Sequence, residues 1–310
     1  MAEMNFTKLK KDKRKKLDKG ASVFVVTMLF IPIFSFLVYW VFVNFRSVLL
    51  AFQTPASNEF TLINFQAAIS NVLNFDKLSP VSISTSLKNT FIYLVKDILF
   101  IFFQLFIGYF FYRRICFTRG FQIILYLPMI VSGVVMSTMF SSFIRPSGPL
   151  GTLLHALGVE EVPQFLQNSD YANGTIIFYT LWMGWGGNML LMSGAYARIP
   201  LEIIESARLD GIGMIREFFK IIFPLTWATV STLIVLTMTG MFSNSGPVLL
   251  FTQGSYGTST MGYWIYHRVY FDGVSAYNEV SAAGLMLTLI GAPIILFVKW
   301  LIERVPVAEF

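Results

Sequence analysis

Six apolar stretches, each of about 20 residues, constrain the fold of this chain more than any other feature of its sequence. They cover residues 22–45, 91–112, 122–143, 176–196, 221–241 and 281–302. A helix needs about 20 predominantly apolar residues to cross the hydrocarbon core of a bilayer. Each stretch therefore predicts one transmembrane helix. Together they predict an all-α, polytopic integral membrane protein with six transmembrane helices.

The composition favours a membrane protein over a soluble one. Charged residues make up only 13% of the chain and hydrophobic residues 55%, whereas soluble domains carry about 25% charged residues. The net charge of +6 does not indicate nucleic-acid binding, because eight of the 23 basic residues lie in one run, residues 8–19. A basic run directly before an apolar stretch is typical of a cytoplasmic anchor, and it also attracts anionic membrane lipid.

The uneven distribution of Lys and Arg sets the predicted orientation. With the N-terminus in the cytoplasm, 17 of the 23 basic residues fall in cytoplasmic segments and five in external ones. Because cytoplasmic loops carry the excess of basic residues, both termini are predicted to be cytoplasmic. The first stretch, 22–45, is too long for the apolar part of a signal peptide and has no small-residue cleavage site after it, so we expect a retained span.

The sequence has no motif for enzymatic chemistry or nucleotide binding. It lacks a G-x-x-x-x-G-K-[ST] phosphate loop, so ATP and its magnesium would need a separate chain. It also lacks G-x-S-x-G, H-E-x-x-H and paired-carboxylate arrangements. His155 and His267 lie far apart without neighbouring ligand residues, so no metal site is expected. Cys116, the single cysteine, excludes an intrachain disulfide.

The polar segment between the fourth and fifth stretches carries the strongest functional signal. Its apolar positions recur with helical spacing and form one stripe, made of Ile204, Ala207, Gly211 and Ile215. Its charged positions, Glu202, Glu205 and Arg208, lie off that stripe. Since Asp210-Gly211 is a turn dipeptide, we expect two short helices joined at Gly211. This pattern alone also fits an interfacial amphipathic helix without a protein partner.

The same segment resembles the E-A-A-x3-G-x9-I-x-L-P signature of the permease subunits of binding-protein-dependent ABC importers. The signature positions match at full spacing in Glu205, Ala207, Gly211, Ile221 and Pro224, and depart from it at Ser206 and Phe223. The resemblance implies that residues 200–217 form the coupling helix of this family, which docks on an ATPase subunit. Carried over to this chain, the coupling residues are Glu205, Ser206, Ala207, Asp210, Gly211 and Pro224.

Shorter motifs extend the resemblance from about residue 60 onward. They occupy residues 86–93, 127–132, 147–158, 250–254 and 263–266, although the loop at 147–158 has Thr152 or a neighbour in place of the usual asparagine. They are similar to the carbohydrate-uptake branch, with its maltose-type and glycerol-phosphate-type systems. The resemblance implies a type I ABC importer permease fold in the bacterial inner membrane. It further implies a second, different permease subunit, cytoplasmic ATPase subunits, an extracellular solute-binding protein and a carbohydrate substrate.

Two polar segments are candidates for the substrate pathway. Trp182, Trp185 and Asn188 combine aromatic faces with an amide, as sugar sites commonly do. Ordinary helix packing through the neighbouring glycines is the alternative. Ser243, Asn244 and Ser245 offer hydroxyl and amide groups at the outer end of the fifth stretch, where a polar helix terminus is the alternative.

Lys96 and Asp97 lie within the second apolar stretch. Charges in a span are costly unless they are paired or face water. Because sequence neighbours do not share a helix face, we do not expect the two to satisfy each other fully. Either they line the pathway or contact another span, or the span begins near Ile98 and leaves both at the wet interface. The last interpretation is favoured.

These predictions divide the chain into a basic cytoplasmic tail, a first transmembrane helix, an external loop, a five-helix permease core and a C-terminal cytoplasmic tail. Their bounds are 1–21, 22–45, 46–90, 91–304 and 305–310. Short helices are expected in the external loops at about 65–73 and 150–157. The main alternative is a secondary transporter or channel without an ATPase. Such a protein would be expected to carry ionisable groups deep in its spans and, in many cases, two related halves.

Overall fold

The computed structural model describes residues 19–54, 59–73, 81–115 and 117–305, which form a helical bundle. Cys116 and most of the two predicted tails lie outside these residues. In the described part, four continuous helices are long and apolar enough to cross a membrane, or up to five if a bent pair counts as one span. The predicted all-α class is confirmed. The six spans and the cytoplasmic position of both termini stay predictions.

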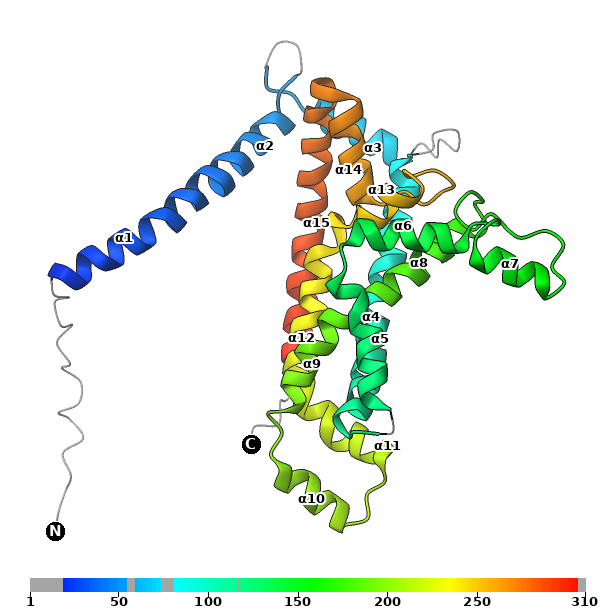
Figure 1. Ribbon diagram of the computed structural model, residues 1–310. Coiled ribbons are helices and arrows are strands. Elements are labelled where there is room, and N and C mark those ends of the chain that lie inside the picture. Colours follow the sequence, from blue (N-terminus) through cyan, green and yellow to red (C-terminus); the bar gives the residue numbers. More distant parts are fainter. Residues whose placement is uncertain (1–18, 55–58, 74–80, 116, 306–310) are drawn as a thin grey trace, which may run out of the picture.

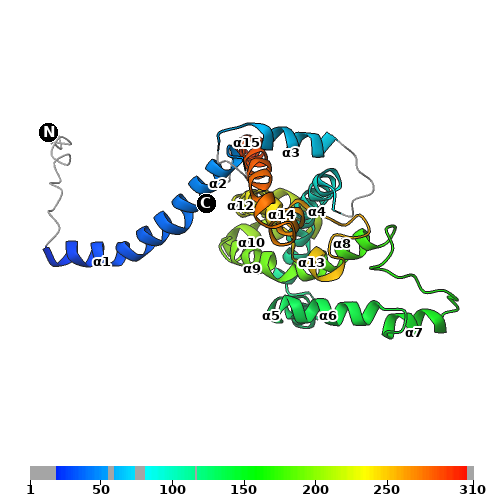
Figure 2. The same cartoon turned by 90° about the horizontal axis from the view of Figure 1, so that it is seen from above.

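The first long helix stands apart from the bundle along its N-terminal part and packs against the C-terminal helix at its other end (Figures 1 and 2). It runs through α1 (Lys19–Ser35), the π-helical turn η2 (Phe36–Phe42) and α2 (Val43–Ala51), and is therefore longer than predicted. Its most apolar part is entirely unburied, which fits a helix surrounded by lipid or by another membrane protein. The end of α2 is fixed by Asn278, whose Nδ2 donates to the Leu50 and Gln53 carbonyl oxygens at 3.1 and 2.6 Å.

The bundle is organised around α4 (Ile83–Tyr112), which packs against α9 (Trp185–Tyr196) and α12 (Phe223–Gly240). The C-terminal helix α15 (Tyr277–Glu303) packs against α12 in turn. The main apolar cluster includes Leu105, Tyr109, Tyr196, Ile222 and Val230. Tyr196 donates its hydroxyl to the Leu105 carbonyl oxygen, which satisfies a polar group that would otherwise be costly to bury.

The predicted third span, 122–143, is wrong as a single helix. Its residues belong to α5 (Thr118–Ile130) and α6 (Gly133–Ile144), and the chain bends by 111° between them. Pro128 in the last turn of α5 has no N–H for the helix ladder, and Val131 then adopts an extended backbone with φ −85° and ψ 145°. In Figure 2, α5, α6 and α7 (Pro149–Ala156) lie along one side of the bundle.

The predicted fourth span, 176–196, is also interrupted. It consists of α8 (Ala172–Met183) and α9, which are separated at Gly184. Gly184, Gly186 and Gly187 are weak helix formers, each costing about 1 kcal/mol relative to alanine in a helix interior. Gly184 also accepts a tertiary hydrogen bond from Gln104, described below. The apolar pattern alone does not reveal the break.

Short helices cover the end of the bundle where α2 joins it (Figure 1). They are α3 (Ile63–Leu73), η4 (Met241–Ser243), α13 (Gly246–Phe251), α14 (Met261–Phe271) and η5 (Gly273–Ala276). The short helices predicted in the two external loops are confirmed as α3 and α7. A network of side chains ties these elements together, because Arg268 of α14 contacts both Asp272 and Glu279, and Glu279 accepts from Asn71 of α3 at 2.7 Å. We call this region the outer cap.

Candidate coupling segment and substrate cavity

At the end of the molecule opposite the outer cap lies α10 (Leu201–Leu209), which follows Pro200 (Figure 1). Its side chains at Ile204 and Ala207 are buried, and Ile204 joins the main apolar cluster. The carboxylate of Glu205 and the hydroxyl of Ser206 are on exposed residues. Leu209, at the helix end, is 90% exposed. The helix is thus anchored along one face and presents a polar face outward.

A glycine cap ends α10. Gly211 has φ +73°, a left-handed conformation that glycine adopts without steric cost. Its N–H donates to the Arg208 carbonyl oxygen at 3.0 Å, and the Ile212 N–H donates to the Ala207 carbonyl oxygen at 3.1 Å. These two bonds form a Schellman motif, which satisfies carbonyl groups at the helix end. The backbone conformation therefore accounts for glycine at this position.

The predicted turn at Gly211 is confirmed, but the predicted apolar stripe is only half right. The chain continues into α11 (Met214–Glu217), so two short helices do flank the turn. Ile204 and Ala207 are buried, whereas Gly211 and Ile215 are exposed. The stripe fails because the left-handed turn changes the chain direction before helical spacing could bring Ile215 onto the same face.

Pro224 lies in the first turn of α12, where the sequence places it, but the helical path begins further upstream. α11 runs into the π-helical turn η3 (Phe218–Ile222) and from there into α12. A proline inside a helix removes one hydrogen bond and its ring clashes with the carbonyl group four residues before it. The wider π-helical turn directly before Pro224 provides the local adjustment that such a residue requires.

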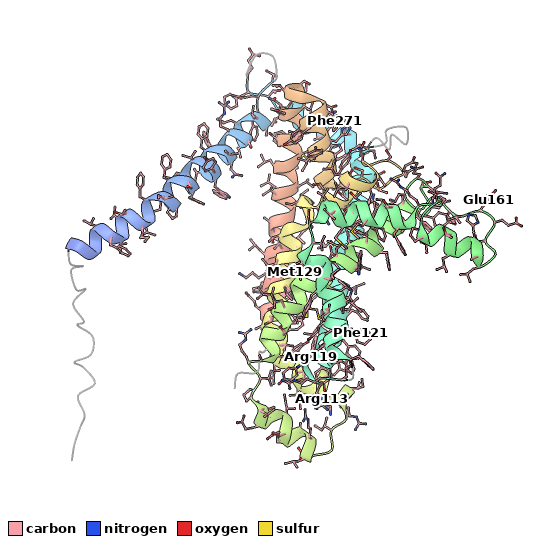
Figure 3. The ribbon with its side chains drawn as sticks, in the orientation of Figure 1. Arg113, Arg119, Phe121, Met129, Glu161 and Phe271 are labelled. Carbon is pink, nitrogen blue, oxygen red and sulfur yellow. The ribbon has the colours of Figure 1, made fainter. Side chains whose placement is uncertain are left out.

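A buried ion pair connects this segment to α4. Glu217 is fully buried, and Arg113 Nη1 donates to its two carboxylate oxygens at 3.3 and 3.4 Å. Arg113 is the residue that ends α4. Figure 3 shows Arg113 and Arg119 toward the end of the molecule opposite Phe271, which lies in the outer cap. The sequence analysis did not identify this contact, because nothing in the pattern distinguishes Glu217 from the exposed charges around it.

A polar cavity of about 340 Å³ opens between α4, α8, α9, α12 and η4. It brings together three of the candidate pathway residues, Asn188, Ser243 and Asn244, which lie far apart in the sequence. Other lining residues were not identified from the sequence: Thr90, Tyr93, Leu94, Phe100, Thr180, Gly184, Leu236, Thr237, Gly240 and Met241. Ser245, Trp182 and Trp185 are not part of the lining. We call this space the polar cavity.

The two tryptophans pack against aromatic side chains instead. Trp182 lies 6.3 Å from the ring of Phe140, in the cluster that covers α6. Trp185 contacts Phe100 and Phe103 edge-on, with ring centroids 5.1 and 5.6 Å away. Among these, Phe100 belongs to the cavity lining. The aromatic surfaces of the polar cavity therefore come from α4, through Tyr93 and Phe100.

Gln104 holds one wall of the cavity in place. Its side chain is fully buried in α4, its Nε2 donates to the Gly184 carbonyl oxygen at 2.8 Å, and its Oε1 accepts from Asn188 Nδ2 at 2.9 Å. Both bonds reach the broken helix α8–α9, so one amide positions two lining residues. The sequence contains a signal that was missed, because a lone glutamine in an apolar span needs a polar partner.

Lys96 and Asp97 form an ion pair with each other, but they also make the contacts outside their own helix that the sequence analysis gave as an alternative. Lys96 Nζ lies 2.7 Å from Asp97 Oδ1 and donates to Thr180 Oγ1 at 2.9 Å. α4 begins at Ile83 and places the pair about halfway along the helix, and the favoured position at the wet interface stays a prediction. A flexible lysine stem can curl back to the next residue, which the rule for helix faces does not consider. Asp97 lines the polar cavity.

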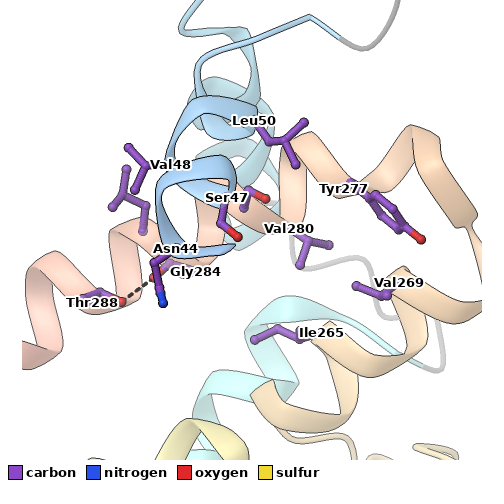
Figure 4. Close-up of a pocket in the computed structure, with 12 residues that line it drawn as sticks. Asn44, Ser47, Val48, Leu50, Ile265, Val269, Tyr277, Val280, Gly284 and Thr288 are labelled. Atoms are coloured by element: carbon purple, nitrogen blue, oxygen red, sulfur yellow. Dashed lines mark hydrogen bonds between the residues drawn. The ribbon is translucent and has the colours of Figure 1, made fainter. Parts of the chain in front are cut away.

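A second cavity, of about 550 Å³, lies between α2, α14 and α15 (Figure 4). Its lining combines aliphatic side chains, such as Val48, Ile265 and Val280, with polar ones, such as Asn44 and Ser47. It includes none of the candidate pathway residues and no charged side chain. The predicted pathway residues Asn188, Ser243 and Asn244 lie at the smaller polar cavity instead.

Comparison with known proteins identifies a matching family and several similar permeases. The family described as "Binding-protein-dependent transport system inner membrane component" matches residues 101–306. The probable ABC transporter permease protein YurN of Bacillus subtilis (strain 168) is 28% identical over 174 residues, which cover 54% of this chain and 60% of YurN. The sn-glycerol-3-phosphate transport system permease protein UgpA of Yersinia pseudotuberculosis serotype I (strain IP32953) is 28% identical over 185 residues, 58% of this chain and 62% of UgpA.

The maltose/maltodextrin transport system permease protein MalF of Yersinia pestis is 28% identical over 193 residues, 58% of this chain and 36% of MalF. The matched region therefore spans less than two thirds of each of these three relatives. Among solved structures, a bacterial ABC transporter involved in the import of the acidic polysaccharide alginate has a TM-score of 0.79 at 20% identity, and the match covers 92% of this chain and 96% of that chain. This likeness confirms the predicted permease fold. By the match over residues 101–306, this chain belongs to the family of inner membrane components of binding-protein-dependent transport systems.

Proposed function

We propose that this chain is the membrane-spanning permease subunit of an ATP-driven importer, and that α10 docks on a separate ATPase. The observation that carries the proposal is the construction of α10. Its apolar face is anchored in the core at Ile204 and Ala207, while Glu205 and Leu209 stand exposed at the end of the bundle. A rigid helix anchored on one face and exposed on the other suits contact with a moving partner.

Two connections support transmission of movement from α10 to the polar cavity. The first is the chain itself, which runs from Gly211 through α11 and η3 into α12. The second is the Arg113–Glu217 pair, which joins α11 to the end of α4. Both α4 and α12 contribute residues to the cavity lining. A displacement of α10 would therefore act on two walls of the cavity through packed, continuous elements.

The proposed substrate is a carbohydrate. The polar cavity combines hydroxyl and amide side chains with the rings of Tyr93 and Phe100. Ligand sites use such apolar and aromatic surfaces together with a few placed polar groups to fix orientation. One relative supports the same class, since it is named for maltose and maltodextrin.

The proposed assembly lies in the bacterial plasma membrane and contains several other chains. A second, different permease subunit completes the pathway. An extracellular solute-binding protein delivers the sugar at the outer cap, and cytoplasmic ATPase subunits bind ATP and magnesium. This chain spans the membrane six times with both termini in the cytoplasm, and it catalyses no reaction itself. A match to a bacterial alginate ABC transporter in complex with a periplasmic protein, at a TM-score of 0.73, supports the fold required for such an assembly.

The docking role is tested by Glu205→Lys in the assembled complex. We expect the variant to stay in the membrane but to recover about tenfold less ATPase on affinity purification, because like or unmatched charges at an interface cost several kcal/mol. Glu161→Lys is the matched control, since Glu161 is exposed and lies far from α10 (Figure 3). Unchanged ATPase recovery with Glu205→Lys would contradict the docking role. Uptake by the purified chain alone, driven by an ion gradient, would instead support a secondary transporter.

A further inference from the structure

Asp97 places a negative charge on the wall of the polar cavity, within the long apolar helix α4. α4 extends from Ile83 to Tyr112, so Asp97 lies about halfway along it. The Asp97 side chain is 36% exposed and belongs to the cavity lining. An ionised group inside an apolar, membrane-spanning helix is costly, and such residues generally face a water-filled space and serve a function.

The positive charge beside Asp97 is held away from that space. Lys96 is not part of the lining, and its side chain is 11% exposed. Its ammonium group is engaged by Asp97, by Thr180 Oγ1 and by the ring of Tyr93, whose centroid lies 5.1 Å from Nζ. A solute in the cavity therefore meets the carboxylate first and the ammonium group behind it.

Three other polar side chains of the lining are uncharged and available. The side chains of Thr237, Ser243 and Asn244 form no hydrogen bond to any residue in the described part of the chain. Hydroxyl and amide groups can donate or accept, whereas an ionised carboxylate only accepts. No Lys, Arg or His is among the described residues that line the cavity. The wall thus offers one strong acceptor and no cation to balance an anionic solute.

We propose that Asp97 makes the polar cavity selective for neutral sugars and against acidic ones. The carboxylate accepts hydrogen bonds from sugar hydroxyl groups, which are stronger than bonds between neutral groups. A sugar carboxylate or phosphate would instead be repelled by Asp97 at short range. This inference rests on the proposed carbohydrate substrate and specifies that the carbohydrate is uncharged. Lys96 is a positioning residue, because it orients the Asp97 carboxylate through their direct contact.

The first experiment measures binding of matched sugars to the purified complex of this chain with its partner permease and ATPase, without a solute-binding protein. Saturation-transfer NMR compares the methyl glycosides of glucose, galactose and mannose with the corresponding uronates at pH 7. We expect binding of a neutral glycoside, and at least about tenfold weaker binding of its uronate. Equal binding of the two would overturn the charge selection while leaving the carbohydrate substrate in place. If neither binds, the proposed carbohydrate substrate fails as well.

The second experiment assigns the selection to Asp97. In Asp97→Asn, Lys96 loses its counterion, so we expect the uronate to gain about tenfold in affinity while the neutral glycoside changes by less than about threefold. Because an unpaired Lys96 can destabilise the fold, the double variant Lys96→Gln/Asp97→Asn removes both charges. It should bind the two sugars equally.

Asp170→Asn is the control, since Asp170 is exposed and outside the cavity lining, and it should keep the original preference. If folded Asp97→Asn or the double variant keeps the preference for the neutral glycoside, the ion pair only holds α4 against α8 and the inference is wrong.

Discussion

The coupling segment and the polar cavity are built in different ways. α10 and its glycine cap occupy one short stretch of chain, from Leu201 to Ile212. The hydrogen bonds of the cap lie within that stretch, and Ile204 packs into the main apolar cluster. The polar cavity draws its lining from α4, α8, α9, α12 and η4, so it exists only when distant parts of the chain are packed together. The comparison shows that the end of α10 is set by hydrogen bonds of neighbouring backbone groups. The shape of the polar cavity depends instead on buried polar contacts between distant helices.

The energetic consequences differ in the same way. In α10, two buried apolar side chains and a Schellman motif suffice to set the helix. Around the cavity, the amide of Gln104 and the Lys96–Asp97 pair form hydrogen bonds inside the bundle. Removing one partner of such a buried contact leaves the other unsatisfied, which costs more than the contact itself contributes. The Arg113–Glu217 pair connects the two regions.

Arg113→Met should have the largest effect, because it breaks that connection. Loss of one partner from a buried ion pair typically costs about 3–5 kcal/mol, since the remaining charge is uncompensated. We expect a lower thermal denaturation temperature in detergent and loss of sugar-stimulated ATP hydrolysis in the assembled complex. Arg216→Met is the matched control, because Arg216 is exposed and forms no ion pair within the described residues. Equal denaturation temperatures for the two variants would show that the buried carboxylate of Glu217 is not stabilised by Arg113.

The sequence predicts α10 better than the polar cavity, because α10 depends on local contacts and the cavity on contacts between distant residues. α10 and the turn at Gly211 were predicted correctly, because a glycine cap and the helical spacing of apolar residues can both be recognised in neighbouring residues of the sequence. Its stripe was extended too far, to Ile215, because helical spacing was continued across the turn. The spans at 122–143 and 176–196 were predicted as single helices, because apolar composition measures length but reveals neither the bend at Val131 nor the break at Gly184.

The cavity was only partly predictable. Asn188, Ser243 and Asn244 were selected as polar groups in apolar surroundings, and the fold brings them together. The two tryptophans were selected for their chemistry, but tertiary packing directs them into aromatic clusters instead. The contact between Gln104 and Asn188 joins residues 84 positions apart. Local spacing contains no information about such a pairing, although the isolated glutamine was a usable signal.

Gln104→Leu tests whether the cavity depends on a buried contact, and its effect should be the next largest. The change leaves Asn188 Nδ2 without its partner and frees the Gly184 carbonyl oxygen, which should cost about 1–3 kcal/mol. We expect lower thermal stability and weaker sugar binding, with normal recovery of the ATPase. Ser193→Ala is the control, because the Ser193 hydroxyl is exposed and bonds only within α9, to Leu190. Loss of the ATPase would contradict the separation of the two regions.

Gly211→Ala acts on the coupling segment alone. A Cβ at this position meets no atom within 4 Å, so the cost comes from the left-handed backbone and should be about 1–2 kcal/mol. We expect reduced recovery of the ATPase with unchanged sugar binding. Gly213→Ala is the matched control, because Gly213 has φ −70° and equally open surroundings. If both alanine variants behave alike, the left-handed cap is not what positions α10.

Phe100→Ala should have the smallest effect and divides the aromatic residues into those that line the cavity and those that only pack. A ring contact contributes about 0.5–1.5 kcal/mol beyond burial, so we expect sugar affinity to fall about threefold to tenfold. Trp182→Ala removes a larger ring that is not part of the lining, and should lower thermal stability more than affinity. The measurement is a pair of sugar titrations and melting curves on the assembled complexes. If only Trp182→Ala lowers the affinity for sugar, the aromatic surface that contacts the sugar lies on α8 rather than on α4. The original sequence prediction, in which the tryptophans line the pathway, would then be preferred.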